Sequence, residues 1–359
     1  MEYFSCKTRI ISGTGAIWKL GELKIRNLLI VADPYFEKTD IPTNVIRAAG
    51  AEQTTCFYDI SPDPSVELAA RGTALVQQIQ PDTVIALGGG SAIDCAKAMV
   101  YFSGQKPRLV AIPTTSGSGS EVTDFAILTH NGVKHPLVDD AILPDVAILD
   151  GNLLDSLPPS LIADTGFDIL THAVESFVAQ GAGAITDALA RDAFAAAFTA
   201  LPASFRGDTR VRQRIHIAAT MAGMAFSQAG LGLCHSMSHV LGAQLHLPHG
   251  RLNAILLPAV MDANRAANHR YAALSQGVGL GSAAELLAVR NLRNGLIKLR
   301  KELGMPGTLQ EAGADCNLSR QQRQKICEAV LSDPCCASNP VPVTERMVLE
   351  VLEAVTGRG

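Results

Sequence analysis

The chain changes its hydrophobic pattern once, near its middle, and this change limits the folds open to it. Before about residue 150, short runs of branched apolar residues alternate with helical stretches. Continuous apolar strands separated by helices are typical of a parallel sheet covered on both faces. The clearest strands are expected at 27–33, 82–90, 108–116 and 145–150.

After Pro158 the pattern is helical throughout. Long Ala- and Leu-rich segments, such as 185–203 and 211–230, repeat apolar residues with the period of an α-helix, and strand-like runs almost vanish. We therefore predict an N-terminal α/β domain with a parallel sheet over 1–157 and an all-α C-terminal domain over 158–359. No internal repeat or low-complexity tract is visible.

Composition excludes several classes of protein. With 359 residues, 47% apolar and 18% charged, the chain can bury a large core. A net charge of −4 without a basic block, and only 5% aromatic residues, argue against nucleic acid as a partner. No run approaches the roughly 18 apolar residues of a membrane span, so no membrane partner is expected.

The N-terminal residues and the cysteines indicate the cellular compartment of the protein. The N-terminus carries Glu2 and lacks the apolar core of a signal peptide. None of the eight cysteines shows C-x-x-C spacing, which is the pattern of reduced thiols in a cytoplasmic protein. We expect a cytoplasmic protein.

Four candidate metal ligands lie in the helical half of the chain. Asp168 precedes His172 by four residues, so both side chains share one face of a helix. His235 and His249 follow in a segment interrupted by Pro248. Taken alone, an acid and a histidine at this spacing are more often a surface pair than metal ligands. Likewise, an isolated histidine is more often an ordinary core or surface residue. Most of the nine histidines, however, fall from His172 to His249 in an apolar region, and a carboxylate with three imidazoles suits iron(II) or zinc(II).

The α/β half carries a candidate cofactor site. The strand at 82–90 runs through three glycines into a helix expected to open at Ser91, where backbone N–H groups attract an anion such as pyrophosphate. A Thr/Ser/Gly loop at 113–123 follows the next strand, and Asp33 ends the strand at 27–33. Each feature alone also fits a plain turn. Together, at the carboxyl ends of parallel strands, they favour a dinucleotide, NAD(H), held in part by a ribose contact to Asp33.

Several longer segments resemble a known family. GGGSAIDCAKA, PTTSGSGSEVT, TGFDILTHAVE, GMAFSQAGLGLCHSMSH and LPHGRLNAILLP are similar to the iron-dependent (group III) alcohol dehydrogenases, and the match covers essentially the whole chain. Within that family, TRIISGTGAI, ISPDPSVE and the SNP segment near the C-terminus are most similar to the propanediol-utilisation 1-propanol dehydrogenases and related bacterial microcompartment enzymes. The resemblance implies a dinucleotide-binding domain followed by a metal-binding one.

The resemblance also implies roles for individual residues. It places the family's metal ligands on Asp168, His172, His235 and His249, and its proton-relay histidine on His239. It places the cofactor contacts on Asp33, Gly88, Gly89, Gly90, Ser91, Asp94, Thr114, Thr115, Ser118 and Lys134. It places the substrate pocket on Phe125, Ile127, Phe226 and Cys335, with Phe125 replacing a polar residue of some diol-active relatives.

The expected function is that of a metal-dependent NAD(H) alcohol dehydrogenase, with Fe²⁺ or Zn²⁺, that reduces short-chain aldehydes such as propanal and ethanal to primary alcohols. The alternatives are a glycerol or diol dehydrogenase of the same superfamily, a lyase on the same scaffold, and an inactive structural component of a microcompartment. We expect a homo-oligomer, a dimer, working in the cytoplasm with microcompartment proteins as partners.

Overall fold

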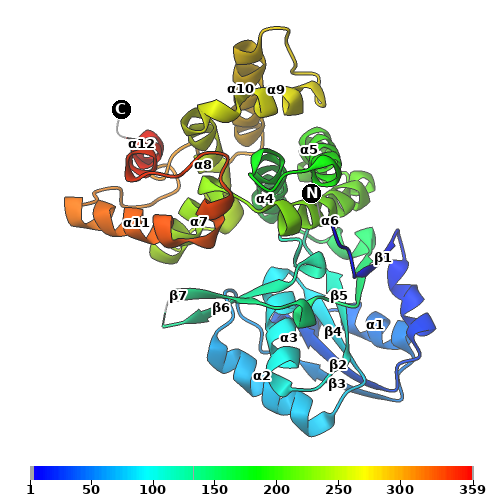
Figure 1. Cartoon of the computed structure of the whole chain (residues 1–359). Helices are drawn as coiled ribbons and strands as arrows, with labels where there is room; N and C mark the ends of the chain where they lie inside the picture. Colours follow the sequence, from blue (N-terminus) through cyan, green and yellow to red (C-terminus); the bar gives the residue numbers. More distant parts are fainter. Residues whose placement is uncertain (1–3, 132, 358–359) are drawn as a thin grey trace. The chain divides into compact units, whose positions relative to one another are not determined.

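The computed structural model describes residues 4–131 and 133–357 (Figure 1). The chain divides into two compact units, and the division falls between Leu157 and Pro158. Phe4 groups with the residues from Pro158 onwards rather than with the first unit, which begins at Ser5. Each unit is described by itself below.

The first unit is built on a six-stranded sheet in the order β1-β8-β5-β4-β2-β3. All of its strand pairings are parallel, which confirms the predicted sheet. The central strands β4 and β5 carry Val, Ile, Leu and Ala on both faces, so both faces need a cover. The strands are β1 (Arg9–Ser12), β2 (Asn27–Ala32), β3 (Gln53–Phe57), β4 (Thr83–Gly88), β5 (Arg108–Pro113) and β8 (Val146–Leu149).

Helices cover the two faces of this sheet (Figure 1). Alternate residues of a strand point to opposite faces. Accordingly, Leu29 and Val31 of β2 pack with α2 (Val66–Ile79) and α3 (Gly90–Ser103). Leu28 and Ile30 pack on the other face, with α1 (Ile41–Ala49). Two apolar cores therefore enclose the sheet, one on each side.

A two-stranded antiparallel hairpin, β6 (Phe125–His130) with β7 (Val133–Val138), was not predicted from the sequence. Two buried side chains of α3 attach it to the unit. Lys97 donates from Nζ to the carbonyl oxygen of Phe125 at 2.8 Å, and Asp94 accepts the backbone N–H of Ile127 on Oδ2 at 3.0 Å.

The second unit contains only helices among its described residues, which confirms the predicted helical half. Helix α4 is buried almost throughout and packs against α5, α6 and α8. Leu201 of α5 would meet a Cβ at Gly166 at 2.4 Å, so the glycine permits the close approach of these helices. The helices are α4 (Pro159–Val178), α5 (Ala184–Phe205), α6 (Arg212–Ala229), α7 (Leu233–Leu245), α8 (His249–Ala263), α9 (Asn268–Gln276), α10 (Glu285–Glu302), α11 (Arg320–Ser332) and α12 (Glu345–Thr356).

Among the described residues, no helix taken singly is long and apolar enough to cross a membrane. Thr209–Ala229 and Leu233–Leu245 meet that test only as a pair, and the pair is bent by 105°.

Candidate metal centre and cofactor site

Helix α4 supplies the acidic side of the candidate metal centre. Asp168, His172 and Glu175 follow one another at spacings of four and three residues, so they lie along one face of the helix. All three are buried among apolar residues. Asp168 and His172 were predicted from the sequence, whereas Glu175 was not, although its spacing of three residues from His172 is the signal that could have found it.

Glu175 fixes the start of helix α7. It accepts the backbone N–H groups of Gly232, Cys234 and His235 at 3.1, 2.7 and 3.2 Å. A carboxylate at this position satisfies N–H groups that have no partner within the helix. A Cβ at Gly232 would come within 2.9 Å of Oε1 of Glu175, so the glycine lets the carboxylate approach.

Glu175 also orients His235, one of the predicted metal ligands. Its Oε2 lies 2.7 Å from Nδ1 of His235. A histidine whose Nδ1 hydrogen is donated to a carboxylate presents Nε2 as its acceptor, which is the nitrogen that faces Asp168. Glu175 therefore sets both the position and the tautomer of His235.

His249 reaches the same point because α8 begins beside α4. It is the first residue of α8, directly after Pro248. A Cβ at Gly250 would lie 1.8 Å from the carbonyl oxygen of Asp164, so only glycine allows this contact of the two helices. The Arg251 guanidinium then forms a two-pronged ion pair with Asp164, at 3.1 and 2.9 Å.

The four predicted ligands meet at Asp168, and the donor atoms of Asp168, His235 and His249 all lie within 4.8 Å of one another. Oδ1 of Asp168 lies 3.8 Å from Nε2 of His172, 3.7 Å from Nε2 of His235 and 3.5 Å from Nε2 of His249. The ring of His172 stacks on that of His235 with 4.5 Å between centroids. Asn253, fully buried, donates to the same Asp168 oxygen at 2.9 Å and holds the carboxylate in place.

The electrostatics of this cluster favour a cation. Burial raises the pKa of Asp168, but the three histidines outweigh it and hold that pKa well below its usual range. Burial lowers the pKa of His235, yet pairing with Asp168 and Glu175 raises it to about 9. One carboxylate and three imidazoles therefore fit a borderline divalent ion.

His239, the predicted proton relay, lies one turn after His235 on α7. Its Nδ1 is 2.9 Å from Oδ2 of Asp333, and its ring stacks on that of His249 with centroids 5.3 Å apart. The Asp333 carboxylate also accepts from Ser236 Oγ and from the Cys335 backbone N–H. Asp333 was not predicted from the sequence because no local pattern links it to a histidine 94 residues earlier.

The predicted cofactor residues lie within the first unit, at the carboxyl ends of β2, β4 and β5. The Thr114 N–H donates to the carbonyl oxygen of Gly88 at 3.0 Å. A Cβ at Gly89 would meet Thr115 Oγ1 at 3.0 Å, and one at Gly90 would meet Ser118 Oγ at 3.0 Å. The glycine turn and the Thr/Ser loop therefore form one cradle at the N-terminus of α3, as an anionic cofactor requires.

Details of this site differ from the prediction. Helix α3 begins at Gly90 with Gly89 as its N-cap, so Ser91 lies inside its first turn rather than opening it. Asp33 caps the short 3₁₀ helix Pro34–Lys38 by accepting the Tyr35 N–H at 2.9 Å. Lys134 forms an ion pair with Asp63 at 2.7 Å. Burial raises the pKa of Asp94, whose Oδ1 has no hydrogen-bond partner among the described residues.

The predicted pocket residues belong to both units. Phe226 stacks on His172 with centroids 4.3 Å apart, and Cys335 lies beside Asp333 and His239 in the helical unit. Phe125 and Ile127 lie on β6 of the other unit and are half-buried.

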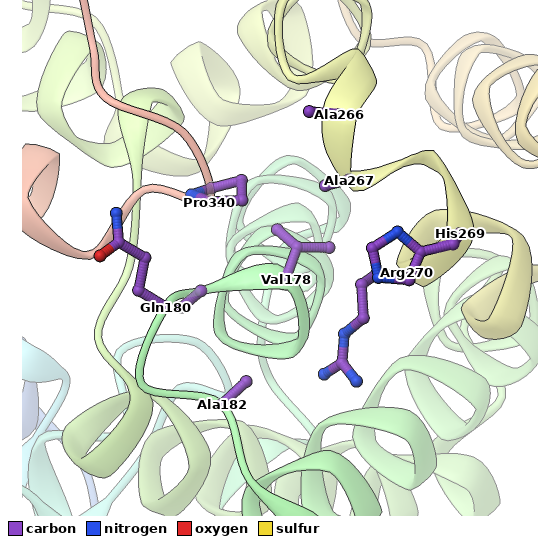
Figure 2. Close-up of a pocket in the computed structure, with 9 residues that line it drawn as sticks. Val178, Gln180, Ala182, Ala266, Ala267, His269, Arg270 and Pro340 are labelled. Carbon is purple, nitrogen blue, oxygen red and sulfur yellow. The ribbon is translucent and has the colours of Figure 1, made fainter.

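A separate cavity of about 240 Å³ opens at the end of α4, and no metal ligand lines it. Figure 2 shows its small apolar walls beside Gln180 and Arg270. His269 also lines the cavity, and the other two polar side chains are engaged: Arg270 pairs with Asp187 at 2.8 Å, and Gln180 donates to the Asn339 carbonyl at 2.7 Å. We assign no ligand to this cavity.

Comparison with known proteins agrees with this geometry. Residues 7–151 match the family model described as iron-containing alcohol dehydrogenase, and residues 162–356 match that of the C-terminal part of the same family.

Three individual proteins are similar over nearly their full lengths. The 1-propanol dehydrogenase PduQ of Salmonella typhimurium is 39% identical over 98% of this chain and 99% of its own. An NADPH-dependent butanol dehydrogenase of Clostridium saccharobutylicum is 36% identical, with 99% and 98% covered. A sulfoacetaldehyde reductase from Bifidobacterium kashiwanohense, solved in complex with NAD⁺, superposes with a TM-score of 0.89 at 26% identity, with 100% of both chains covered.

Proposed function

This chain belongs to the iron-containing alcohol dehydrogenase family, and on that premise we propose that it reduces short-chain aldehydes such as propanal and ethanal to primary alcohols with NADH. The observation that carries the proposal is the convergence of one buried carboxylate and three imidazole nitrogens, Asp168 with His172, His235 and His249. Similarity to a 1-propanol dehydrogenase supports the choice of substrate.

The residues of the chain divide the work. When bound, a divalent ion would supply a Lewis acid and NADH would supply the hydride. Asp168 and the three imidazoles would hold the ion, and the cradle of Gly88 to Ser91 with Thr114, Thr115 and Ser118 would hold the pyrophosphate part of the cofactor. Besides hydride transfer, the reaction needs the transfer of a proton at the substrate oxygen.

His239 would carry that proton. Because its Nδ1 faces Asp333 at 2.9 Å, the hydrogen of the neutral ring lies on Nδ1 and Nε2 is the acceptor. Protonated on Nε2, the ring would give that proton to the former carbonyl oxygen of the substrate, which becomes the alcohol hydroxyl. In the reverse direction it would take the proton back and pass it to solvent, which the partly exposed side chain reaches.

The character of the pocket would select the substrate. Phe125, Ile127 and Phe226 are apolar, and none can hold a charged or polyhydroxylated aldehyde. Each CH₂ buried there contributes up to ~0.8 kcal/mol until the space is filled. We therefore expect propanal and ethanal to exceed glyceraldehyde in kcat/KM.

The test is a steady-state comparison of propanal, glyceraldehyde, glycerol and 1,2-propanediol in both directions, with NADH or NAD⁺ as required. The proposal expects reduction of propanal to dominate near neutral pH. A clear preference for glycerol or the diol would favour the diol dehydrogenase alternative instead. Full activity after exhaustive chelation would refute the role of the metal.

The choice of metal and the setting of the enzyme belong to the same proposal. Zinc(II) is expected to bind this ligand set at least as tightly as iron(II), so the supply of metal would decide which is present. We propose a dimer that regenerates NAD⁺ while removing an aldehyde inside a bacterial microcompartment. Sedimentation of the purified protein, and its recovery with purified microcompartments, test these two points.

A further inference from the structure

A second group of metal-binding atoms lies beside the first. Donor atoms of His239, Asp333 and Cys335 all lie within 4.8 Å of one another. His239 comes from α7, whereas Asp333 and Cys335 come from the start of the 3₁₀ helix Pro334–Ser338. None of the three belongs to the ligand set of Asp168.

We propose that His239, Asp333 and Cys335 form a second, regulatory site for a borderline divalent ion such as zinc(II). A nitrogen, a carboxylate oxygen and a thiolate sulfur are the donors that zinc prefers. Bonds of about 2.0–2.3 Å place donors around a tetrahedral ion roughly 3.3–3.7 Å apart. The distance of 2.9 Å between Nδ1 of His239 and Oδ2 of Asp333 therefore needs only a small widening.

The site is held ready by its surroundings. Oδ1 of Asp333 already accepts from Ser236 Oγ at 3.0 Å and from the Cys335 N–H at 2.9 Å, which leaves Oδ2 directed at His239. The side chain of His239 is 29% exposed, so solvent reaches the site and water can complete the coordination. Of the two adjacent cysteines, Cys336 donates from its thiol to the Val330 carbonyl at 3.0 Å, whereas the sulfur of Cys335 belongs to the cluster.

Filling this site would stop the proton relay, a consequence that rests on the proposed function. An ion on Nδ1 displaces the hydrogen bond to Asp333, the ring hydrogen moves through solvent from Nδ1 to Nε2, and the proton of the Cys335 thiol is released to solvent. The hydrogen of the neutral ring then lies on Nε2, the nitrogen that must accept a proton during turnover. The second ion therefore inhibits an enzyme whose first site is already filled.

The experiment adds Co²⁺ to protein that already carries one equivalent of metal. Cobalt bound to a thiolate absorbs strongly in the near ultraviolet, so the absorption reports the second site without turnover. The wild type should bind one further equivalent with this absorption. Cys335→Ser should abolish the absorption and weaken binding at least tenfold, whereas the matched control Cys336→Ser should leave both unchanged.

Inhibition is measured on the same proteins with Zn²⁺, each relative to its own rate without added ion. The inhibition constant should rise at least tenfold in Cys335→Ser and remain unchanged in Cys336→Ser. Equal behaviour of the two variants, or no second equivalent in the wild type, would overturn the proposed site. If no aldehyde is reduced at all, the proposed function fails, and the cobalt absorption still decides whether the second site exists.

Discussion

At the scale of single residues, the Glu175 carboxylate connects two parts of the metal centre. It accepts Nδ1–H of His235 at 2.7 Å and the Cys234 N–H at the start of α7, also at 2.7 Å. A carboxylate behind a ligating histidine raises its basicity and fixes its ring. The affinity of the site for metal should therefore depend on a residue that does not itself bind the ion.

We predict that Glu175→Gln weakens metal binding 10- to 100-fold, in the range found when such partners are removed. The amide keeps the size of the side chain but loses the charge that holds His235. Competition with a chelator of known affinity measures the effect, and the exposed Glu350→Gln is the control. Unchanged affinity in Glu175→Gln would show that the backbone of α7 alone positions His235.

Asp333 should make stability depend on pH in acid. Burial raises its pKa, but the hydrogen bond and charge of His239, together with hydrogen bonds from Cys335 and Ser236, outweigh this and lower the pKa from 3.8 to about 2. A carboxyl with a lowered folded pKa stabilises the fold above its unfolded pKa, and the contribution is lost as pH falls from about 3.8 to about 2. The shift corresponds to at most about 2 kcal/mol.

The free energy of unfolding should thus differ between the wild type and Asp333→Asn at pH 5, and this difference should shrink towards pH 2. Urea titrations at a series of pH values measure it, with the exposed Asp315→Asn as the control. A difference that stays constant down to pH 2 would contradict the assignment of the ion pair.

Asp33 should decide between the two nicotinamide cofactors. A carboxylate near the ribose repels a 2′-phosphate, but Asp33 also caps a 3₁₀ helix through the Tyr35 N–H. Asp33→Asn keeps an acceptor for that cap and removes the charge, so it separates the two roles better than Asp33→Gly. The ratio of kcat/KM for NADPH to that for NADH should rise at least tenfold, or ~1.4 kcal/mol. A wild type that prefers NADPH would show that Asp33 acts only as a cap.

At the scale of elements, the approach of α8 to α4 depends on Gly250. A Cβ there would meet the Asp164 carbonyl oxygen at 1.8 Å, and backbone cannot move aside as a flexible side chain can. We predict that Gly250→Ala displaces His249, lowers metal content after dialysis and destabilises the protein by about 1–3 kcal/mol.

Gly242→Ala on α7 is the matched control for this change, because its Cβ would meet Leu252 at an ordinary 3.4 Å. Metal analysis and thermal unfolding of both variants provide the comparison. Retention of the full metal content in Gly250→Ala would show that α8 can shift without losing its ligand.

Element patterns and single contacts differ in how well the sequence predicts them. Strand β4 is an uninterrupted run of buried residues, and α5 is a long Ala- and Leu-rich helix, so both were predicted from composition and period. The hairpin of β6 and β7 was missed because β7 is mostly exposed and contains Pro136. It therefore lacks the continuous apolar run that marks the central strands. Contacts between residues that are far apart in the sequence, such as that of Asp333 with His239, leave no local pattern in the sequence. Asp168 and His172 were predictable as a pair because residues four apart on a helix lie on the same face.

At the scale of the whole molecule, the predicted metal site and the predicted cofactor site belong to different units. The predicted metal ligands all lie after Pro158, and the residues predicted to bind the cofactor lie before it. We predict that metal slows amide hydrogen exchange chiefly in α4, α7 and the start of α8, because binding stabilises the state that binds. NADH should slow exchange chiefly at the start of α3 and in residues 114–118.

Mass-spectrometric exchange with each ligand alone tests this division, and chelated protein without cofactor is the reference. Protection by metal confined to the sheet of the first unit would contradict the assignment of the ligands. Protection by NADH confined to α7 would contradict the assignment of the cradle.

The run of functional residues along α4 has a consequence for how relatives of this chain can diverge. Asp164, Asp168, His172 and Glu175 share one face only while the helix keeps its register. A single inserted or deleted residue turns everything beyond it by about 100°. Between Asp164 and Glu175, mutation can therefore replace residues but cannot change their number. In homologous sequences, insertions should instead occur in exposed loops such as 279–284.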